Sequence, residues 1–131
     1  MNPELVMSDE SGEPQAARPA APGGKSDRRQ AERYQMDAGL VARPSHNRSR
    51  VIRGRIVDLS RAGISAVMAA DLQLGELLEV QFELPYAARP VHMKVSICNR
   101  EGYRYGLEFV NVIASQQEMI NRTCATLALL R

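Results

Sequence analysis

Three arginines near residue 30 are the first residues in this chain whose types and spacing could bind a ligand. Arg28 and Arg29 are adjacent, and Arg33 follows Arg29 at a spacing of four. A guanidinium group donates two parallel hydrogen bonds from a planar fork, which suits phosphate oxygens and the Hoogsteen edge of guanine. Alone, such a stretch is more typical of a solvated basic surface, so its interpretation depends on a second group of polar residues.

That second group is the segment 58–63, with the sequence DLSRAG. The Asp58 carboxylate can accept hydrogen bonds from N1–H and the N2 amine of guanine, and the Ser60 hydroxyl can serve a phosphate or a base edge. Gly63 permits either a positive φ or the close approach of a ligand. These residue types also favour an ordinary hairpin turn, and both interpretations hold together if the turn presents the site.

The sequence carries no signature of an enzyme or of a metal site. The motifs HExxH, GxSxG, GxxxxGK[ST] and GxGxxG are absent. His46 and His92 have no partner at metal-ligand spacing, while Cys98 and Cys124 form no CxxC pair and have no adjacent base. We therefore predict solvated histidines, buried or half-buried cysteines, and a non-catalytic protein without a metal or cofactor.

Six short segments with strand-like patterns must position these residues. Three of them alternate strictly between apolar and polar side chains, and three fit by β-branched content and bounding turns. Alternation places one face in a core and the other in water, which favours antiparallel pairing in a small barrel or sandwich. The predicted strands are Ala38–Arg43, Val51–Asp58, Ile64–Met68, Leu78–Leu84, Val91–Ile97 and Tyr103–Phe109.

The last two predicted strands also indicate a turn and part of the core. Asn99 and Gly102 are typical of a tight connection between them. Tyr103, Tyr105 and Phe109 share one face of the final strand. We therefore expect these three rings in the core rather than on a platform that stacks bases.

The C-terminal segment has helical rather than strand periodicity. Ser115 and Glu118 have the spacing of a capping box, in which each side chain satisfies a backbone N–H of the first turn. Ile120, Cys124 and Leu127 then recur at helical spacing. The sequence predicts a terminal helix that packs on the barrel across one open end.

The formal net charge of +2 is unevenly distributed along the chain. Residues 1–26 carry a net charge of −2, are rich in proline and glycine, and are predicted to be a disordered tail. Residues 28–61 contain nine arginines and three acidic residues, a net charge of +6, which favours a phosphate-bearing partner. Without a long apolar run or a secretory signal, a cytoplasmic location is expected.

Together, the two polar groups resemble the motifs of the PilZ domain. Arg29 and Arg33 form an RxxxR pattern, and residues 58–63 form a [DN]xSxxG pattern after one strand-sized segment. The late segment YRYGLEF is similar to the tyrosine, glycine and phenylalanine pattern of the family's final strand. The resemblance covers residues 27–131 and leaves residues 1–26 unmatched. It implies a mainly β fold, a six-stranded antiparallel β-barrel, here followed by the predicted C-terminal α-helix.

The resemblance also implies a ligand, because PilZ domains bind the bacterial second messenger cyclic di-GMP. The RxxxR arginines would clamp guanine and phosphate, and the residues of segment 58–63 would hold the guanine and shape the surface beneath it. A basic residue at position 28 is associated with binding a stacked pair of ligand molecules. The implied ligand-binding residues are Arg28, Arg29, Arg33, Asp58, Ser60 and Gly63.

We therefore predict a cyclic di-GMP receptor or adaptor. A ligand that contacts both motifs would order the RxxxR segment against the barrel and relay the signal to a separate partner protein. One alternative is a PilZ-like module that binds only protein, and another is a small barrel that binds single-stranded nucleic acid. The absence of tryptophan and an aromatic content of 5% argue against nucleic acid as a partner.

Overall fold

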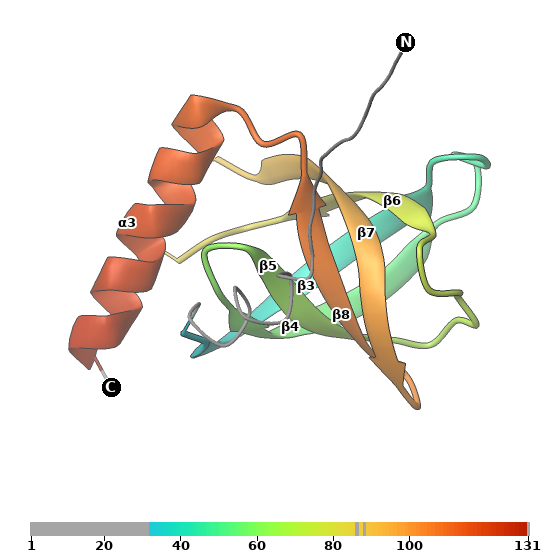
Figure 1. The fold of residues 1–131 in the computed structure, drawn as a ribbon, viewed down its shortest axis with the longest axis horizontal. Helices are drawn as coiled ribbons and strands as arrows, with labels where there is room; N and C mark the ends of the chain where they lie inside the picture. Colours follow the sequence, from blue (N-terminus) through green and yellow to red (C-terminus); the bar gives the residue numbers. More distant parts are fainter. Residues whose placement is uncertain (1–31, 86, 88, 131) are drawn as a thin grey trace, which may run out of the picture. The chain divides into compact units, whose positions relative to one another are not determined.

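The computed structural model describes residues 32–85, 87 and 89–130, and residues 1–31, 86, 88 and 131 lie outside this description (Figure 1). The tail predicted over residues 1–26 is therefore outside the described residues. The same holds for Arg28 and Arg29 of the predicted ligand site.

Six strands of the described chain close into one antiparallel barrel, which confirms the predicted fold class (Figure 1). Two of the strand pairs that complete the barrel wall join strands that are not consecutive in the sequence. Around the barrel, the strands are β3 (Tyr34–Pro44), β4 (Ile52–Leu59), β5 (Gly63–Met68), β8 (Arg104–Val110), β7 (Val91–Glu101) and β6 (Leu77–Phe82), and the helix α3 (Ala114–Leu130) follows β8.

Strand β3 begins at Tyr34, earlier than the predicted start at Ala38. The register between β3 and β4 shifts between Gln35 and Ala38, where a bulge interrupts the alternation of inward and outward side chains. The period-two pattern therefore becomes visible only after the bulge. The earlier start places Arg33 immediately before Tyr34, which pairs with Leu59 of β4.

The inward side chains of the strands fill the barrel, as their alternation predicts. Tyr105 is fully buried, and its hydroxyl donates to the Ala70 carbonyl and accepts from the Leu72 N–H at 3.1 Å. Phe109 is half-buried against the core. The prediction that Tyr103 is also a core residue is wrong, because it lies in the hairpin turn before β8 and is 54% exposed.

The connection between β7 and β8 is made later than predicted. Strand β7 continues to Glu101, and Asn99 lies within it, opposite Gly106 and beside a register shift after Ile97. The turn itself is made at Gly102, whose φ of 64° is in the left-handed region that favours glycine. Asn99 is therefore a strand residue, and its side chain lies directly over Gly106.

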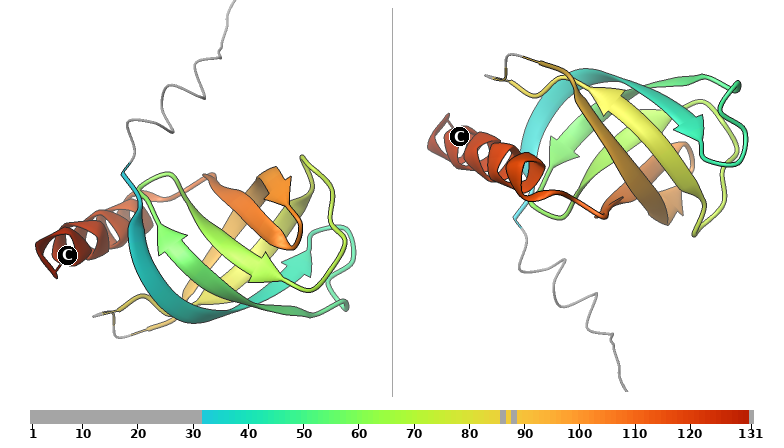
Figure 2. Two further views of the ribbon diagram at one scale, coloured as in Figure 1. Left: turned by 90° about the horizontal axis from the view of Figure 1, so that it is seen from below. Right: turned by 90° about the horizontal axis from the view of Figure 1, so that it is seen from above.

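Helix α3 packs across one open end of the barrel, as the sequence predicts (Figure 2). Ile120, Thr123 and Cys124 are the buried residues of the helix. Ile120 and Cys124 belong to the same apolar cluster as the barrel interior. The covered end is the one at which β3 begins and β4 ends, so the helix lies near the predicted ligand site.

The start of α3 differs from the predicted capping box. The helix begins at Ala114, and the N–H of Gln117 donates to the Ile113 carbonyl at 3.0 Å, so Ser115 lies inside the first turn. The side chain of Gln117 donates to the Arg61 carbonyl at 3.1 Å. This contact ties the start of the helix to the β4–β5 turn. A capping-box pattern involves only residues near each other in the sequence, so it could not predict such a contact.

Candidate ligand-binding site

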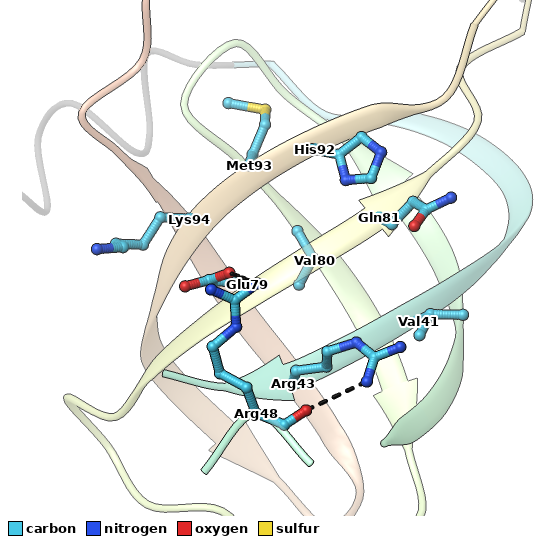
Figure 3. A pocket seen from close by; sticks show the side chains of 9 residues that line it. All are labelled: Val41, Arg43, Arg48, Glu79, Val80, Gln81, His92, Met93 and Lys94. Carbon is cyan, nitrogen blue, oxygen red and sulfur yellow. Dashed lines mark hydrogen bonds and ion pairs between the residues drawn. The ribbon is translucent and has the colours of Figure 1, made fainter. Parts of the chain in front are cut away.

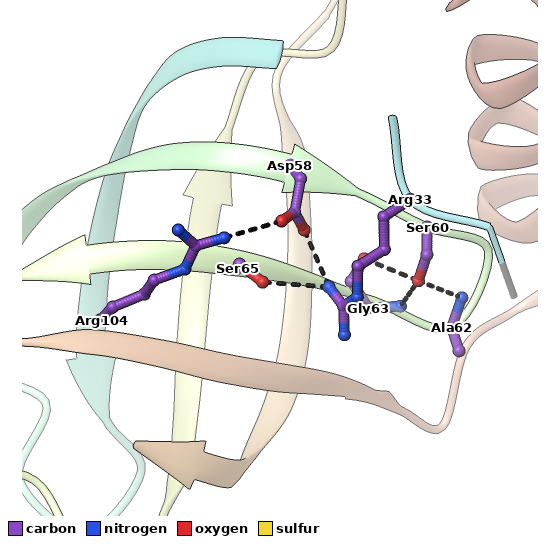
Figure 4. Close-up of polar contacts among 7 residues, drawn as sticks. All are labelled: Arg33, Asp58, Ser60, Ala62, Gly63, Ser65 and Arg104. Carbon is purple, nitrogen blue, oxygen red and sulfur yellow. Dashed lines mark hydrogen bonds and ion pairs between the residues drawn. The ribbon is translucent and has the colours of Figure 1, made fainter. Parts of the chain in front are cut away.

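Arg33 and Asp58, which come from the two predicted motifs, meet on the outer side of the barrel wall (Figure 4). Nη1 of Arg33 donates to Oδ1 of Asp58 at 2.8 Å and to Oγ of Ser65 at 3.0 Å. Asp58 lies near the end of β4, opposite Gln35 of β3 and Ser65 of β5. The barrel thus brings together residues that are 25 positions apart in the sequence.

A second arginine completes the surroundings of the Asp58 carboxylate. Nη2 of Arg104, on β8, donates to Oδ2 of Asp58 at 3.1 Å (Figure 4). The Asp58 side chain is only 11% exposed, whereas those of Arg33 and Arg104 are 40% and 54% exposed. A buried carboxylate needs such partners because it has lost its hydration. Two half-exposed guanidinium groups around one carboxylate leave a local positive charge that suits an anionic ligand.

Ser60 and Gly63 build the turn between β4 and β5. The Ser60 hydroxyl accepts from the N–H groups of Ala62 at 3.2 Å and Gly63 at 3.1 Å (Figure 4). A Cβ at Gly63 would lie 2.1 Å from the Leu107 carbonyl oxygen, so this glycine allows the backbone of β8 to approach closely. Gly63 does not adopt a positive φ, and that part of the sequence interpretation is wrong.

Sequence reasoning missed Ser65 and Arg104. Ser65 is a buried polar residue in the otherwise apolar segment GISAVM, and this contrast was the available signal. Arg104 is 46 positions from Asp58 in the sequence. Their contact depends on the pairing of β5 with β8, which no local pattern reveals.

A hollow of about 370 Å³ lies beside Arg33. Its walls are Arg33, Tyr34 and Gln35 at the start of β3, and Leu127 and Leu130 of α3. The hollow extends the site from the barrel wall toward the helix. It offers both polar and apolar residues to a bound molecule.

A separate groove of about 320 Å³ crosses the outer face of β3, β6 and β7 (Figure 3). Its charged side chains include Arg43, Arg48, Glu79 and Lys94, of which Arg48 and Glu79 form an ion pair of 3.1 Å. His92 lines this groove and is exposed, as predicted. The carboxylate site is built mainly on β4, β5 and β8, so the two features are distinct.

Both cysteines are as sheltered as the sequence predicts, with Cys98 half-buried and Cys124 buried. Burial raises the pKa of the Cys124 thiol, and the nearby Arg61 charge offsets this in part. Among the described residues, no group of three or more His, Cys, Asp or Glu side chains could hold a metal ion. In the same part of the chain, no helix has both the length and the apolar character needed to cross a membrane.

Solved structures of other proteins share this fold, among them the following three. The PilZ domain of YcgR from Escherichia coli with c-di-GMP is 20% identical, with a TM-score of 0.62 over 77% of this chain and 92% of that chain. The PilZ domain of CeSA from a cellulose-synthesizing bacterium is 15% identical, with a TM-score of 0.59 over 74% and 98%. The Bacillus subtilis inhibitor of motility MotI/DgrA is 20% identical, with a TM-score of 0.65 over 78% of this chain and 52% of that protein.

The sequence profile of the PilZ domain matches residues 27–126. The matched region contains both predicted motifs, all strands of the barrel and most of α3. No curated protein matches the sequence. The chain belongs to the PilZ domain family.

Proposed function

We propose that this chain is a receptor or adaptor for cyclic di-GMP, which it binds over Asp58 on the outer barrel wall. The observation that carries the proposal is the 2.8 Å ion pair between Arg33 and Asp58, because it joins the RxxxR and [DN]xSxxG motifs at one point. Arginines supply donors for phosphate oxygens, and the carboxylate supplies an acceptor for the guanine edge. The PilZ domain of Escherichia coli YcgR, which shares the fold, is described with c-di-GMP.

Ligand binding would exchange one partner of Asp58 for another. In the structure, Arg33 donates to Oδ1 of Asp58 and to Oγ of Ser65. The N1–H and N2 amine of guanine would take the place of Arg33 at Oδ1. Arg33 would then turn to a ligand phosphate, together with Arg29. The buried carboxylate keeps hydrogen-bond donors in both states, so the exchange leaves no unpaired charge.

The same exchange would order the segment that carries the RxxxR motif. A ligand that touches both this segment and the barrel binds the ordered state more tightly than any other, as a switch of this kind requires. Arg28 adds a further guanidinium group at the position associated with a stacked pair of ligand molecules. The ligand-binding unit in this proposal is residues 27–131, preceded by a tail over residues 1–26.

The output of such a receptor is a change in its surface rather than a reaction. In the described part of the site, the Ser60 hydroxyl donates to the Gly63 carbonyl at 3.3 Å and the Ser65 hydroxyl accepts from Arg33, so neither is placed as a nucleophile activated by Asp58. We therefore propose a non-catalytic cytoplasmic adaptor that passes the signal to a separate protein partner. The ligand is cyclic di-GMP, with no other cofactor and no nucleic acid.

Thermal unfolding in the presence of three separate ligands tests this function. Cyclic di-GMP should raise the midpoint substantially, whereas GTP and a short oligonucleotide should not, because a ligand stabilises only the state that binds it. Stabilisation by the oligonucleotide alone would instead support a nucleic-acid-binding barrel. If none of the three raised the midpoint, a module that binds only protein would be favoured.

A further inference from the structure

We propose that Arg104 is a positioning residue of the cyclic di-GMP site, which holds the Asp58 carboxylate in place while the guanine edge binds to it. This inference rests on the proposed function. It adds a residue that belongs to neither of the two recognised motifs. The evidence is that two arginines donate hydrogen bonds to different oxygens of the Asp58 carboxylate.

The two arginines bind different oxygens of one carboxylate (Figure 4). Arg33 donates to Oδ1 at 2.8 Å, and Arg104 donates to Oδ2 at 3.1 Å. Arg33 lies just before β3, whereas Arg104 is the first residue of β8 and lies two strands from Asp58. Their backbones therefore lie on opposite sides of β4, although the Arg33 guanidinium group reaches across to Ser65 of β5.

The two arginines differ in how their backbones are held. Arg33 precedes the first strand and belongs to the motif that would turn toward the ligand. Arg104 is held within the barrel wall, where it pairs with Val67 of β5 and with Glu101 of β7. When Arg33 leaves Oδ1, Arg104 remains the cation on Oδ2. It keeps the second oxygen bound and leaves Oδ1 aimed outward to accept from guanine.

The burial of Asp58 makes this second contact necessary. The residue is 8% exposed, so water cannot replace a lost partner on the covered side of the carboxylate. Without Arg104, Arg33 would be the only guanidinium group bound to Asp58 among the residues that the structure describes. Binding of the ligand would then require Arg33 either to stay with Asp58 or to leave it without a cation.

Arg55 is a matched control for the charge of Arg104. Both arginines point outward from the barrel wall. Val67 of β5 lies between them, since it pairs with Arg55 of β4 on one side and with Arg104 of β8 on the other. Arg55, however, donates to Asp37 at 2.8 Å and does not contact Asp58. Removal of either arginine lowers the charge of this wall equally, but only Arg104 should affect the carboxylate.

The test is calorimetry with cyclic di-GMP and with cyclic di-IMP, which lacks only the N2 amine of guanine. The wild type should prefer cyclic di-GMP by roughly tenfold, since the amine donates to a charged acceptor. Arg104→Ala should weaken cyclic di-GMP binding by roughly tenfold and bring the two affinities within about threefold of each other. Arg55→Ala should keep the wild-type preference. Unfolding curves without ligand would check that each variant folds.

Three outcomes would overturn the inference, and they are distinguishable. If Arg104→Ala weakened both ligands equally, Arg104 would be a phosphate contact rather than a positioning residue. If Arg55→Ala had the same effect as Arg104→Ala, only the overall charge of the wall would matter. If the wild type failed to bind cyclic di-GMP, the proposed function itself would be wrong.

Discussion

Arg33 and Asp58 form an ion pair of 2.8 Å between the start of the barrel and the end of its second strand. The contact exists because β3 and β4 are paired so that Tyr34 lies opposite Leu59. The side chain that would clamp a ligand is therefore bound to the carboxylate that would recognise it. In the proposed function, this relationship would make ligand binding a competition for Asp58.

Substitution of the RxxxR arginines should weaken ligand binding without unfolding the barrel. We expect Arg29→Ala or Arg33→Ala to weaken cyclic di-GMP binding by at least tenfold, about 1.4 kcal/mol, because each removes a charge-assisted donor. Arg53→Ala is the control, since Arg53 is an exposed arginine at the start of β4, whereas Asp58 lies near its end. Calorimetry would measure all three affinities, and wild-type values for both RxxxR variants would refute the assignment of these arginines.

Gly63→Ala should lower the free energy of unfolding, whether or not ligand is present. The new Cβ would lie 2.1 Å from the backbone oxygen of Leu107, and a backbone atom in a closed barrel cannot move aside easily. We expect a loss of about 1–3 kcal/mol from this overpacking. Gly39→Ala is the control, because a Cβ added at Gly39 of β3 would meet nothing within 4 Å.

Urea denaturation would compare these two glycine variants with the wild type. Gly39→Ala should stay within about 0.5 kcal/mol of the wild type. Equal stability of the Gly63 and Gly39 variants would show that the close approach of β8 to the turn is not a constraint.

Ser60→Ala should destabilise the ligand-free protein. The buried hydroxyl accepts from the N–H groups of Ala62 and Gly63, and both groups would lose that acceptor. We expect the free energy of unfolding to fall by about 1–3 kcal/mol. Ser49→Ala removes an exposed hydroxyl that bonds to the Asn47 side chain, and should have little effect. Equal denaturation midpoints for the two serine variants would contradict a structural role for Ser60.

The stability of the protein should decrease at alkaline pH because of Cys124. Burial raises the pKa of its thiol in the folded state. In the unfolded chain, the thiol ionises near its ordinary pKa of about 8.5, where the folded protein still keeps the proton. The contribution of this thiol to stability is therefore complete below that pH and is lost as the pH rises through the folded-state pKa.

Denaturant unfolding at a series of pH values would measure this effect. The free energy of unfolding should fall as the pH rises above the ordinary thiol pKa of about 8.5 in the wild type. The fall should be smaller in Cys124→Ala, even though that variant begins with a lower stability. Parallel pH profiles for the two proteins would assign the alkaline loss to other groups.

The elements with regular alternation could be predicted from the sequence, and the contacts between distant strands could not. Leu78–Leu84 and Val91–Ile97 alternate without interruption, and the structure has strands there. The start of β3 could not be predicted because a bulge after Gln35 breaks the alternation. Tyr103 has the spacing of an inward-facing strand residue, but it lies in a turn, where the alternation of inward and outward side chains does not apply.

The same distinction applies to the candidate site. Arg33 and Asp58 belong to motifs with fixed spacing, so a ligand-binding role could be proposed for both before their contact was known. Ser65 and Arg104 reach Asp58 only through the register of β4 with β5 and of β5 with β8. The register of paired strands depends on the hydrophobic pattern of both strands and on bulges, so a short sequence motif cannot predict it.

The most direct test of the proposed ligand site is a calorimetric titration of cyclic di-GMP into the wild type and into Asp58→Ala. Removal of the carboxylate takes away the acceptor for guanine and leaves Arg33 and Arg104 without their shared partner. We predict saturable binding to the wild type and binding at least tenfold weaker in the variant, which corresponds to about 1.4 kcal/mol or more. Equal binding by the two proteins, or no binding by the wild type, would contradict the proposed site.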